Sequence, residues 1–215
     1  MKGRRKEHAD DAPDPVEAAG AETAPIAEPV ETPSPEPVAA PEPPAPSDGR
    51  LTRAAELFAN GDYAAAAEAY GAAVAADPDD LDAVVGLGAT CLAQGHFDAA
   101  EREFRKALRA APGDVAANYQ LALTLFRRGN YVAASTQLRR VIELDREHAA
   151  ALVLLGEALN HTNDPVGAID ALERATTLQP DNGRAYYALG IAYDRRGQPE
   201  RAAEMYRRSR EVGGR

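Results

Sequence analysis

The sequence has no tryptophan and only one cysteine, and aromatic side chains make up just 6% of its 215 residues. The single thiol, Cys91, leaves no partner for an intramolecular disulfide, so the fold does not depend on an oxidising compartment. No run of 18 apolar residues occurs, which argues against a membrane-spanning helix. The scarcity of aromatic residues also weighs against the compact core of a typical enzyme.

Basic residues are outnumbered by acidic ones, with 24 Lys and Arg against 34 Asp and Glu and a formal net charge of -10. A general nucleic-acid binder needs a basic surface to displace counterions, so we expect no nucleic-acid partner. The basic residues 1–8 are followed by acidic residues and proline where a signal peptide would be apolar. We therefore expect a cytoplasmic protein without direct membrane insertion.

Motifs for catalysis and for cofactor or metal binding are also missing. The four histidines, His8, His96, His148 and His161, do not show the spacing of metal ligands. The glycines form no phosphate-binding loop, and no serine lies in a nucleophile motif. We therefore expect no catalytic residue, no metal and no cofactor, and we interpret the chain as non-enzymatic.

Proline divides the chain into two regions, because 11 of its 16 prolines lie in residues 1–46. This segment carries ten acidic and four basic side chains, a net charge of -6. It has too little apolar surface to offset the entropy of ordering, and its prolines oppose helix and sheet. We predict a disordered Pro/Ala/Glu-rich N-terminal tail that serves either as a solubilising spacer or as a tether or docking peptide.

From residue 47 onward, several columns of residues recur every 34 positions. The first column holds residues that tolerate a left-handed backbone: Gly61, Gly95, Gly129, Asn163 and Gly197. Five positions later the residue is always alanine: Ala66, Ala100, Ala134, Ala168 and Ala202. Four positions after that it is always large: Tyr70, Phe104, Leu138, Leu172 and Tyr206. A proline recurs at Pro78, Pro112 and Pro180, with Arg146 at the missing position.

The first half of each repeat follows the pattern of an amphipathic helix. The run Leu152-x-x-Leu155-Gly156-x-x-Leu159 places large and small residues at i, i+3, i+4 and i+7, and residues 84–91, 118–125 and 186–193 match it. The first repeat departs from this pattern, with Arg50 and Arg53 at two positions that are usually apolar. The glycine or asparagine then ends this helix, and a second helix begins at once. We expect Arg146 to make the link between repeats 3 and 4 less sharply bent than a proline would.

These columns resemble the tetratricopeptide repeat, whose 34-residue length and pattern of large residues, glycine, alanine and proline they share. The resemblance covers a domain of residues 47–215 in five repeats: 47–80, 81–114, 115–148, 149–182 and 183–215. It implies an all-α solenoid of helix-turn-helix repeats wound as a right-handed superhelix. The first helix of each repeat is expected to line a concave groove.

In this family, recurring positions of the first helix face the ligand. The resemblance therefore implies a partner-binding groove formed by Leu51, Phe58, Val85, Leu92, Tyr119, Leu123, Phe126, Arg127, Asn160, His161, Arg184, Tyr187, Ile191 and Arg195. The positions that grip a chaperone's C-terminal carboxylate in one subtype hold no basic residue here: Leu51, Ala55, Gly86, Ala116 and Gln120. We therefore expect apolar or helical segments of a protein partner.

The sequence thus predicts a scaffold or assembly factor that binds a protein or peptide. Two alternatives stay open. One is a self-assembling structural protein, because residues 47–100 carry a net charge of -7 and residues 101–215 a net charge of +3. A homo-oligomer would then join opposite ends of the array. The other is an accessory subunit of a larger enzyme or membrane complex.

Overall fold

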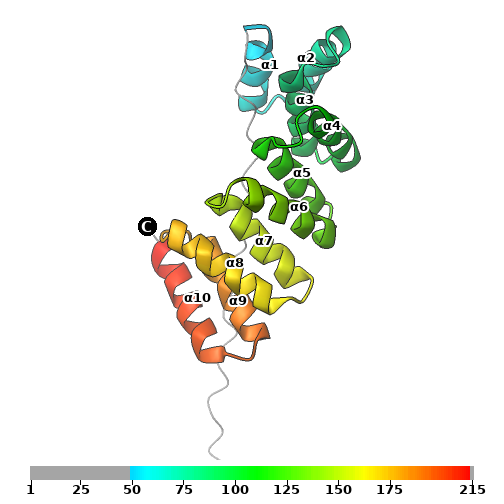
Figure 1. Ribbon diagram of the computed structural model, residues 1–215. Helices are drawn as coiled ribbons and strands as arrows, with labels where there is room; N and C mark the ends of the chain where they lie inside the picture. Colours follow the sequence, from blue (N-terminus) through cyan, green and yellow to red (C-terminus); the bar gives the residue numbers. More distant parts are fainter. Residues whose placement is uncertain (1–48, 214–215) are drawn as a thin grey trace, which may run out of the picture. The chain divides into compact units, whose positions relative to one another are not determined.

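The computed structural model describes residues 49–213, in which every regular element is an α-helix (Figure 1). The odd-numbered helices, termed A helices below, are α1 (Gly49–Ala59), α3 (Leu81–Ala93), α5 (Val115–Arg127), α7 (Ala149–His161) and α9 (Gly183–Arg195). The even-numbered B helices are α2 (Tyr63–Ala76), α4 (Phe97–Ala110), α6 (Tyr131–Leu144), α8 (Pro165–Leu178) and α10 (Pro199–Gly213). The predicted all-α solenoid of five helix pairs is confirmed, while the predicted tail over residues 1–46 lies outside the described residues.

The turn from each A helix to its B helix uses the left-handed backbone that the first column predicts. Gly61, Gly95, Gly129 and Gly197 have φ between 72° and 85°, and Asn163 takes their place with φ 60°. Glycine enters this region without a Cβ clash, and asparagine is among the few other residues that tolerate it. The 34-residue spacing of these residues therefore fixes where each hairpin turns.

Short polar side chains cap most of the helices. Their oxygens accept a hydrogen bond from a backbone N–H three residues further on, at Asp62, Asp80, Asp114, Asn130, Asp164 and Asn182. His148 caps α7 in the same way, since its Nδ1 accepts from the N–H of Ala151 at 3.2 Å. Each cap satisfies one of the backbone donors left free at a helix start.

The recurring alanines and the recurring large residues pack together where the two helices of a repeat meet. The recurring alanines are at most 1% exposed, which lets the A and B helices approach closely. The large column fills the remaining space, and Tyr70, Phe104, Leu138 and Leu172 are all buried. Tyr206 in the last repeat is only half-buried because no described repeat packs beyond it.

The A helices lie on the inner side of the array. Each A helix contacts the next A helix, whereas no two B helices of residues 49–213 contact each other. The pairs follow one another along the array from α1–α2 to α9–α10 (Figure 1). The A helices therefore line the concave face and the B helices form the convex face.

The junction with Arg146 has the same span as the junctions that contain proline. Four residues separate B helix from A helix in each case: 77–80, 111–114, 145–148 and 179–182. The last residue of each turn donates its N–H to the carbonyl of the first, at 3.4 Å for His148 and Asp145 and 3.1–3.2 Å elsewhere. Arg146 therefore leaves the length and the closing hydrogen bond of this turn unchanged, while a difference in bend between repeats 3 and 4 stays a prediction.

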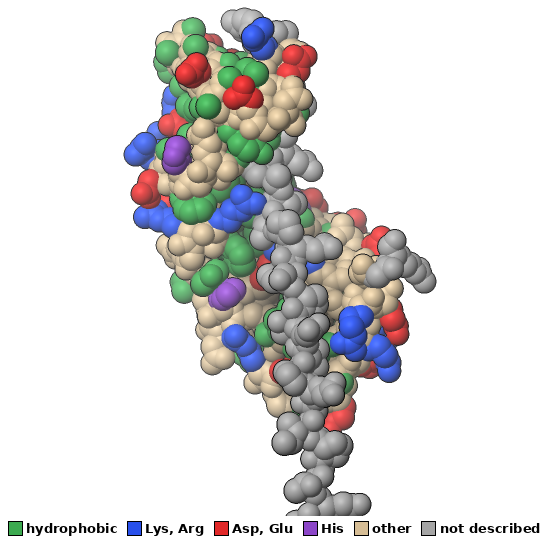
Figure 2. Space-filling view, turned by 180° about the vertical axis from the view of Figure 1, so that it is seen from behind, with side chains coloured by type: hydrophobic (Ala, Val, Ile, Leu, Met, Phe, Trp, Pro, Cys, Tyr) green, Lys and Arg blue, Asp and Glu red, His purple; other side chains and the backbone are tan. Residues whose placement is uncertain are grey.

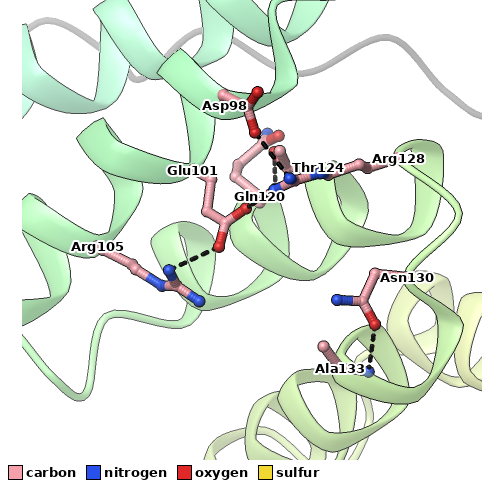
Figure 3. Close-up of polar contacts among 8 residues, drawn as sticks. All are labelled: Asp98, Glu101, Arg105, Gln120, Thr124, Arg128, Asn130 and Ala133. Carbon is pink, nitrogen blue, oxygen red and sulfur yellow. Dashed lines mark hydrogen bonds and ion pairs between the residues drawn. The ribbon is translucent and has the colours of Figure 1, made fainter.

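Polar contacts tie repeat 2 to repeat 3 (Figure 3). Arg128, which follows α5, reaches back to α4 and contacts Asp98 at 2.9 Å and Glu101 at 2.7 Å. Glu101 also pairs with Arg105 on its own helix at 2.6 Å. Because the Glu101 side chain is only 10% exposed, two guanidinium groups balance a largely buried carboxylate.

Candidate functional site

The predicted groove residues differ in how far their side chains reach solvent. Four of them, Leu51, Phe58, Leu92 and Leu123, are buried in the hydrophobic core between helices. Seven are half-buried on the A helices: Val85, Tyr119, Phe126, Arg127, Arg184, Tyr187 and Ile191. His161 and Arg195 are exposed, and Asn160 is buried. The residues that a partner can reach therefore lie mainly on α5, α7 and α9.

Aromatic rings gather where α5 and α7 end. Phe126 contacts Tyr131 and His161 edge to face, with ring centroids 5.2 and 5.9 Å apart. Tyr131 and His161 stack in parallel at 4.0 Å. Nearer the start of α7, Tyr119 lies over His148 at 4.9 Å. The group of three rings links repeat 3 to repeat 4, and it is called, together with Tyr119 and His148, the aromatic cluster below.

Sequence reasoning missed Tyr131 and His148 as parts of this surface. Tyr131 is the first residue of α6, and its counterpart in repeat 1, Tyr63, makes the same edge contact with Phe58 at 5.3 Å. That recurrence could have placed Tyr131 beside Phe126. No comparable signal marked His148, which acts as a helix cap as well as a ring partner.

A second, polar group connects α7 to α9. Arg184 makes a two-pronged ion pair with Glu157, with N–O distances of 2.6 and 2.5 Å. Arg195 donates to the backbone carbonyl of Asn160, whose side-chain amide in turn donates to the carbonyl of Ala188 at 2.9 Å. Asn160 Oδ1 is buried and accepts no hydrogen bond from residues 49–213. These contacts fix the orientation of both arginines on the concave face.

Arg127 lies close to both groups. Burial lowers the pKa of its guanidinium, the neighbouring Tyr119 opposes that shift, and the positive charge of Arg184 adds to it. An arginine nevertheless stays protonated at neutral pH. Arg127 therefore places a half-buried positive charge beside the aromatic cluster.

The C-terminal end of the concave face carries a tyrosine pair. Tyr187 and Tyr206 have ring centroids 5.6 Å apart, and the Tyr206 hydroxyl donates to Asp194 at 2.7 Å. Burial, and secondarily this hydrogen bond, raise the pKa of Tyr206. The hydrogen bond to Asp194 fixes the ring of Tyr206, against which Tyr187 packs.

Within residues 49–213, no three His, Cys, Asp or Glu side chains are grouped as metal ligands. None of the helices in that range has the length and apolar character needed to cross a membrane. Figure 2 shows hydrophobic side chains that reach the surface beside charged and histidine side chains on one face of the array.

Comparison with known proteins agrees with the repeat architecture. Two tetratricopeptide-repeat family models match the chain, one over residues 57–124 and 159–213 and the other over residues 119–182. No curated protein matches the sequence significantly.

Among solved structures, a crystal structure of MamA is 26% identical, covers 75% of this chain and 94% of its own, and has a TM-score of 0.70. A structure of YrrB, described as a TPR protein with an unusual peptide-binding site, is 23% identical over 76% of this chain and 84% of its own, with a TM-score of 0.67. The matched repeats, their 34-residue period and their stacked hairpins show that the chain belongs to the tetratricopeptide-repeat family.

Proposed function

We propose that the chain is a non-enzymatic scaffold or assembly factor that binds a segment of another protein on the concave face of repeats 3 to 5. The aromatic cluster beside Arg127 is the observation that carries this proposal. Aromatic and arginine side chains dominate the energetically important centres of protein interfaces. Packed helices hold these side chains in place, so little ordering entropy opposes binding.

The chemistry of this face indicates the kind of segment that it binds. Aromatic rings and Ile191 favour apolar side chains, while Arg127 and Arg195 favour a carboxylate nearby. We therefore infer a segment with apolar side chains and at least one acidic residue. The YrrB structure supports the proposal to the extent that a protein of the same fold has a peptide-binding site.

Replacement of three groove residues tests the proposal. Full-length protein with Tyr119→Ala, Phe126→Ala and Tyr187→Ala is compared with the unchanged protein by affinity purification and mass spectrometry. We expect the partners that the unchanged protein enriches to be lost, because the apolar contact surface is removed. Circular dichroism checks that helicity is retained.

A matched control removes apolar side chains away from the concave face. Val132 and Val166 are 67% and 55% exposed at the start of two B helices, so Val132→Ala with Val166→Ala should leave the partners in place. The proposal fails if the folded groove variant retains the same partners as the unchanged protein. The identity of those partners also decides whether the chain is an accessory subunit of an enzyme or membrane complex.

Self-assembly is the second candidate, favoured by the division of charge along the array. Nine acidic and two basic side chains lie in residues 47–100, against 15 acidic and 18 basic ones in residues 101–215. Opposite ends of neighbouring molecules would then attract each other, more strongly at low salt. Light scattering at high protein concentration tests this, and a monomer at low salt rules it out.

A further inference from the structure

The convex face contains a cleft that the concave groove does not explain. It lies between α6 and α8 and has a volume of about 600 Å³. Its floor is formed by buried side chains of α7, Leu155 and Leu159. Its walls carry Arg139, Ile142 and Arg146 on one side and Gly167, Ala171 and Arg174 on the other.

Comparison with the repeat before it shows why this junction is hollow. In repeat 3 the counterpart of Ala171 is Gln137, which donates to Asn118 at 2.5 Å. Asn118 in turn donates to the carbonyl of Pro112, the counterpart of Arg146. These two side chains bridge α6 and the turn before α5 at the position that corresponds to the cleft. In repeat 4 the two counterparts are Leu152 and Ala171, which leave it open.

The repeat that follows is filled in a different way. The counterparts of Gly167 and Ala171 are Arg201 and Met205, both larger. The Arg201 guanidinium lies 5.6 Å from the centroid of the Tyr193 ring, and the Tyr193 hydroxyl donates to Glu173 at 2.5 Å. Tyr193 is the counterpart of Leu159, so polar contacts cover the floor that repeat 4 leaves apolar.

Arginines outnumber acids around the cleft, three to two. No carboxylate of residues 49–213 forms an ion pair with Arg139, Arg146 or Arg174. Arg174 donates one hydrogen bond to the carbonyl of Arg146 at 3.2 Å, which spans the junction without neutralising its charge. Two acids also line the cleft, Asp170 and Glu143, and the latter is paired with Arg140 at 3.1 Å.

We propose that this cleft binds an acidic segment of a partner protein that inserts one bulky aliphatic side chain between α6 and α8. The aliphatic group would rest on Leu155 and Leu159, and flanking carboxylates would pair with the three arginines. Burial of an apolar side chain supplies affinity, while the arginines select an acidic sequence over a basic or neutral one. The site is separate from the concave groove, so both segments can bind at once.

The test uses full-length protein and a fluorescein-labelled probe peptide of sequence Glu-Glu-Leu-Glu-Glu, with binding followed by anisotropy. Two control probes replace the leucine by serine or the glutamates by glutamine. We expect each control to bind at least tenfold more weakly than the acidic leucine peptide. Equal binding of the serine peptide would show non-specific charge attraction and would overturn the proposal.

Protein variants then locate the site. Ala171→Met introduces the residue that repeat 5 has at this position. The double change Leu152→Asn with Ala171→Gln introduces the hydrogen-bonded asparagine and glutamine of repeat 3. We expect either to weaken binding at least tenfold, and Arg139→Gln with Arg174→Gln to do the same. Arg207→Gln, which removes an exposed arginine of α10, is the matched control and should change binding less than twofold.

Several outcomes contradict the proposal. Binding that survives both cleft-filling variants, whose folding is checked by circular dichroism and thermal unfolding, places the peptide elsewhere. Loss of binding in the variant with Tyr119→Ala and Phe126→Ala, but not in the cleft variants, assigns the acidic peptide to the concave groove instead. Salt-sensitive self-association that Ala171→Met abolishes, with no peptide binding, assigns the cleft to a second copy of the chain.

Discussion

At the scale of single residues, glycine has two opposite roles within the helices. A Cβ added to Gly86 on α3 would lie 2.3 Å from a ring carbon of Tyr70, whereas one added to Gly71 on α2 would meet no atom within 4 Å. Gly86 is therefore required by the close approach of a large side chain. At Gly71 no neighbouring side chain requires glycine, and the residue only lowers the stability of its helix.

The two glycines should respond oppositely to alanine. Gly71→Ala should raise the free energy of unfolding by about 0.5–1 kcal/mol, because alanine is the better helix former. Gly86→Ala gains the same propensity but displaces the Tyr70 ring, and should cost about 1–3 kcal/mol. Urea unfolding followed by circular dichroism measures both. A stabilising Gly86→Ala would mean that the ring moves freely.

Buried tyrosines make stability depend on pH on the alkaline side. Burial raises the pKa of Tyr70, Tyr193 and Tyr206, and hydrogen bonds to Glu173 and Asp194 add to this for the last two. A phenol whose pKa is higher in the folded state holds its proton there after the unfolded chain has lost it. The folded state is then penalised as pH rises.

We expect the free energy of unfolding to be unaffected by these groups below the pKa of an unfolded tyrosine, about 10, and to fall as pH rises above it. Tyr206→Phe, which removes one such group, should make the decline shallower. Urea unfolding between neutral pH and pH 11 measures both proteins. A stability that rises over this alkaline range would contradict the assignment of neutral, buried phenols.

At the scale of helices, the ion pairs differ in how deeply they are buried. The Glu157 and Arg184 side chains, which link α7 to α9, are 17% and 21% exposed. The pair Arg207 and Glu211 within α10 is more than 60% exposed and 3.8 Å apart. Both pairs join an arginine to a glutamate, so a comparison of the two separates the effect of burial from that of charge.

Glu157→Gln should destabilise the protein by about 1–3 kcal/mol, because it leaves the half-buried Arg184 without its carboxylate. Glu211→Gln, the matched change in the exposed pair, should cost less than about 0.5 kcal/mol. Thermal and urea unfolding of both variants measure the difference. Equal effects of the two substitutions would show that the pair between α7 and α9 is no stronger than a surface contact.

At the scale of the whole array, every contact joins helices that are close in the sequence. Helices of residues 49–213 contact only the next helix or the next A helix. The stability of such an array is the sum of its repeats and their interfaces, so the ends have the fewest supporting neighbours. In α10, only Ala202 is buried.

Hydrogen exchange should therefore be fastest in α1 and α10 and slowest in α5 to α7. The central A helices α5 and α7 bury eight and nine of their 13 residues and have neighbours on both sides. Exchange measured by mass spectrometry on peptic fragments checks this order. Uniform protection from α1 to α10 would instead indicate that the array unfolds as one cooperative unit.

The sequence by itself determined the repeat. Its 34-residue columns located the left-handed turns, the buried alanines and the helix pairs, because each column reflects a local backbone or packing requirement that recurs unchanged. The period also predicted the family, which the matches over residues 57–213 confirm.

Only the tertiary structure decided which of those positions a partner can reach. Leu92 and Leu123 share the helical phase of the groove residues, yet both are buried in the hydrophobic core. The stack of Tyr131 on His161 and the open cleft beside Ala171 likewise arise between repeats. Column patterns describe one repeat at a time, whereas a surface forms from the side chains that differ between adjacent repeats.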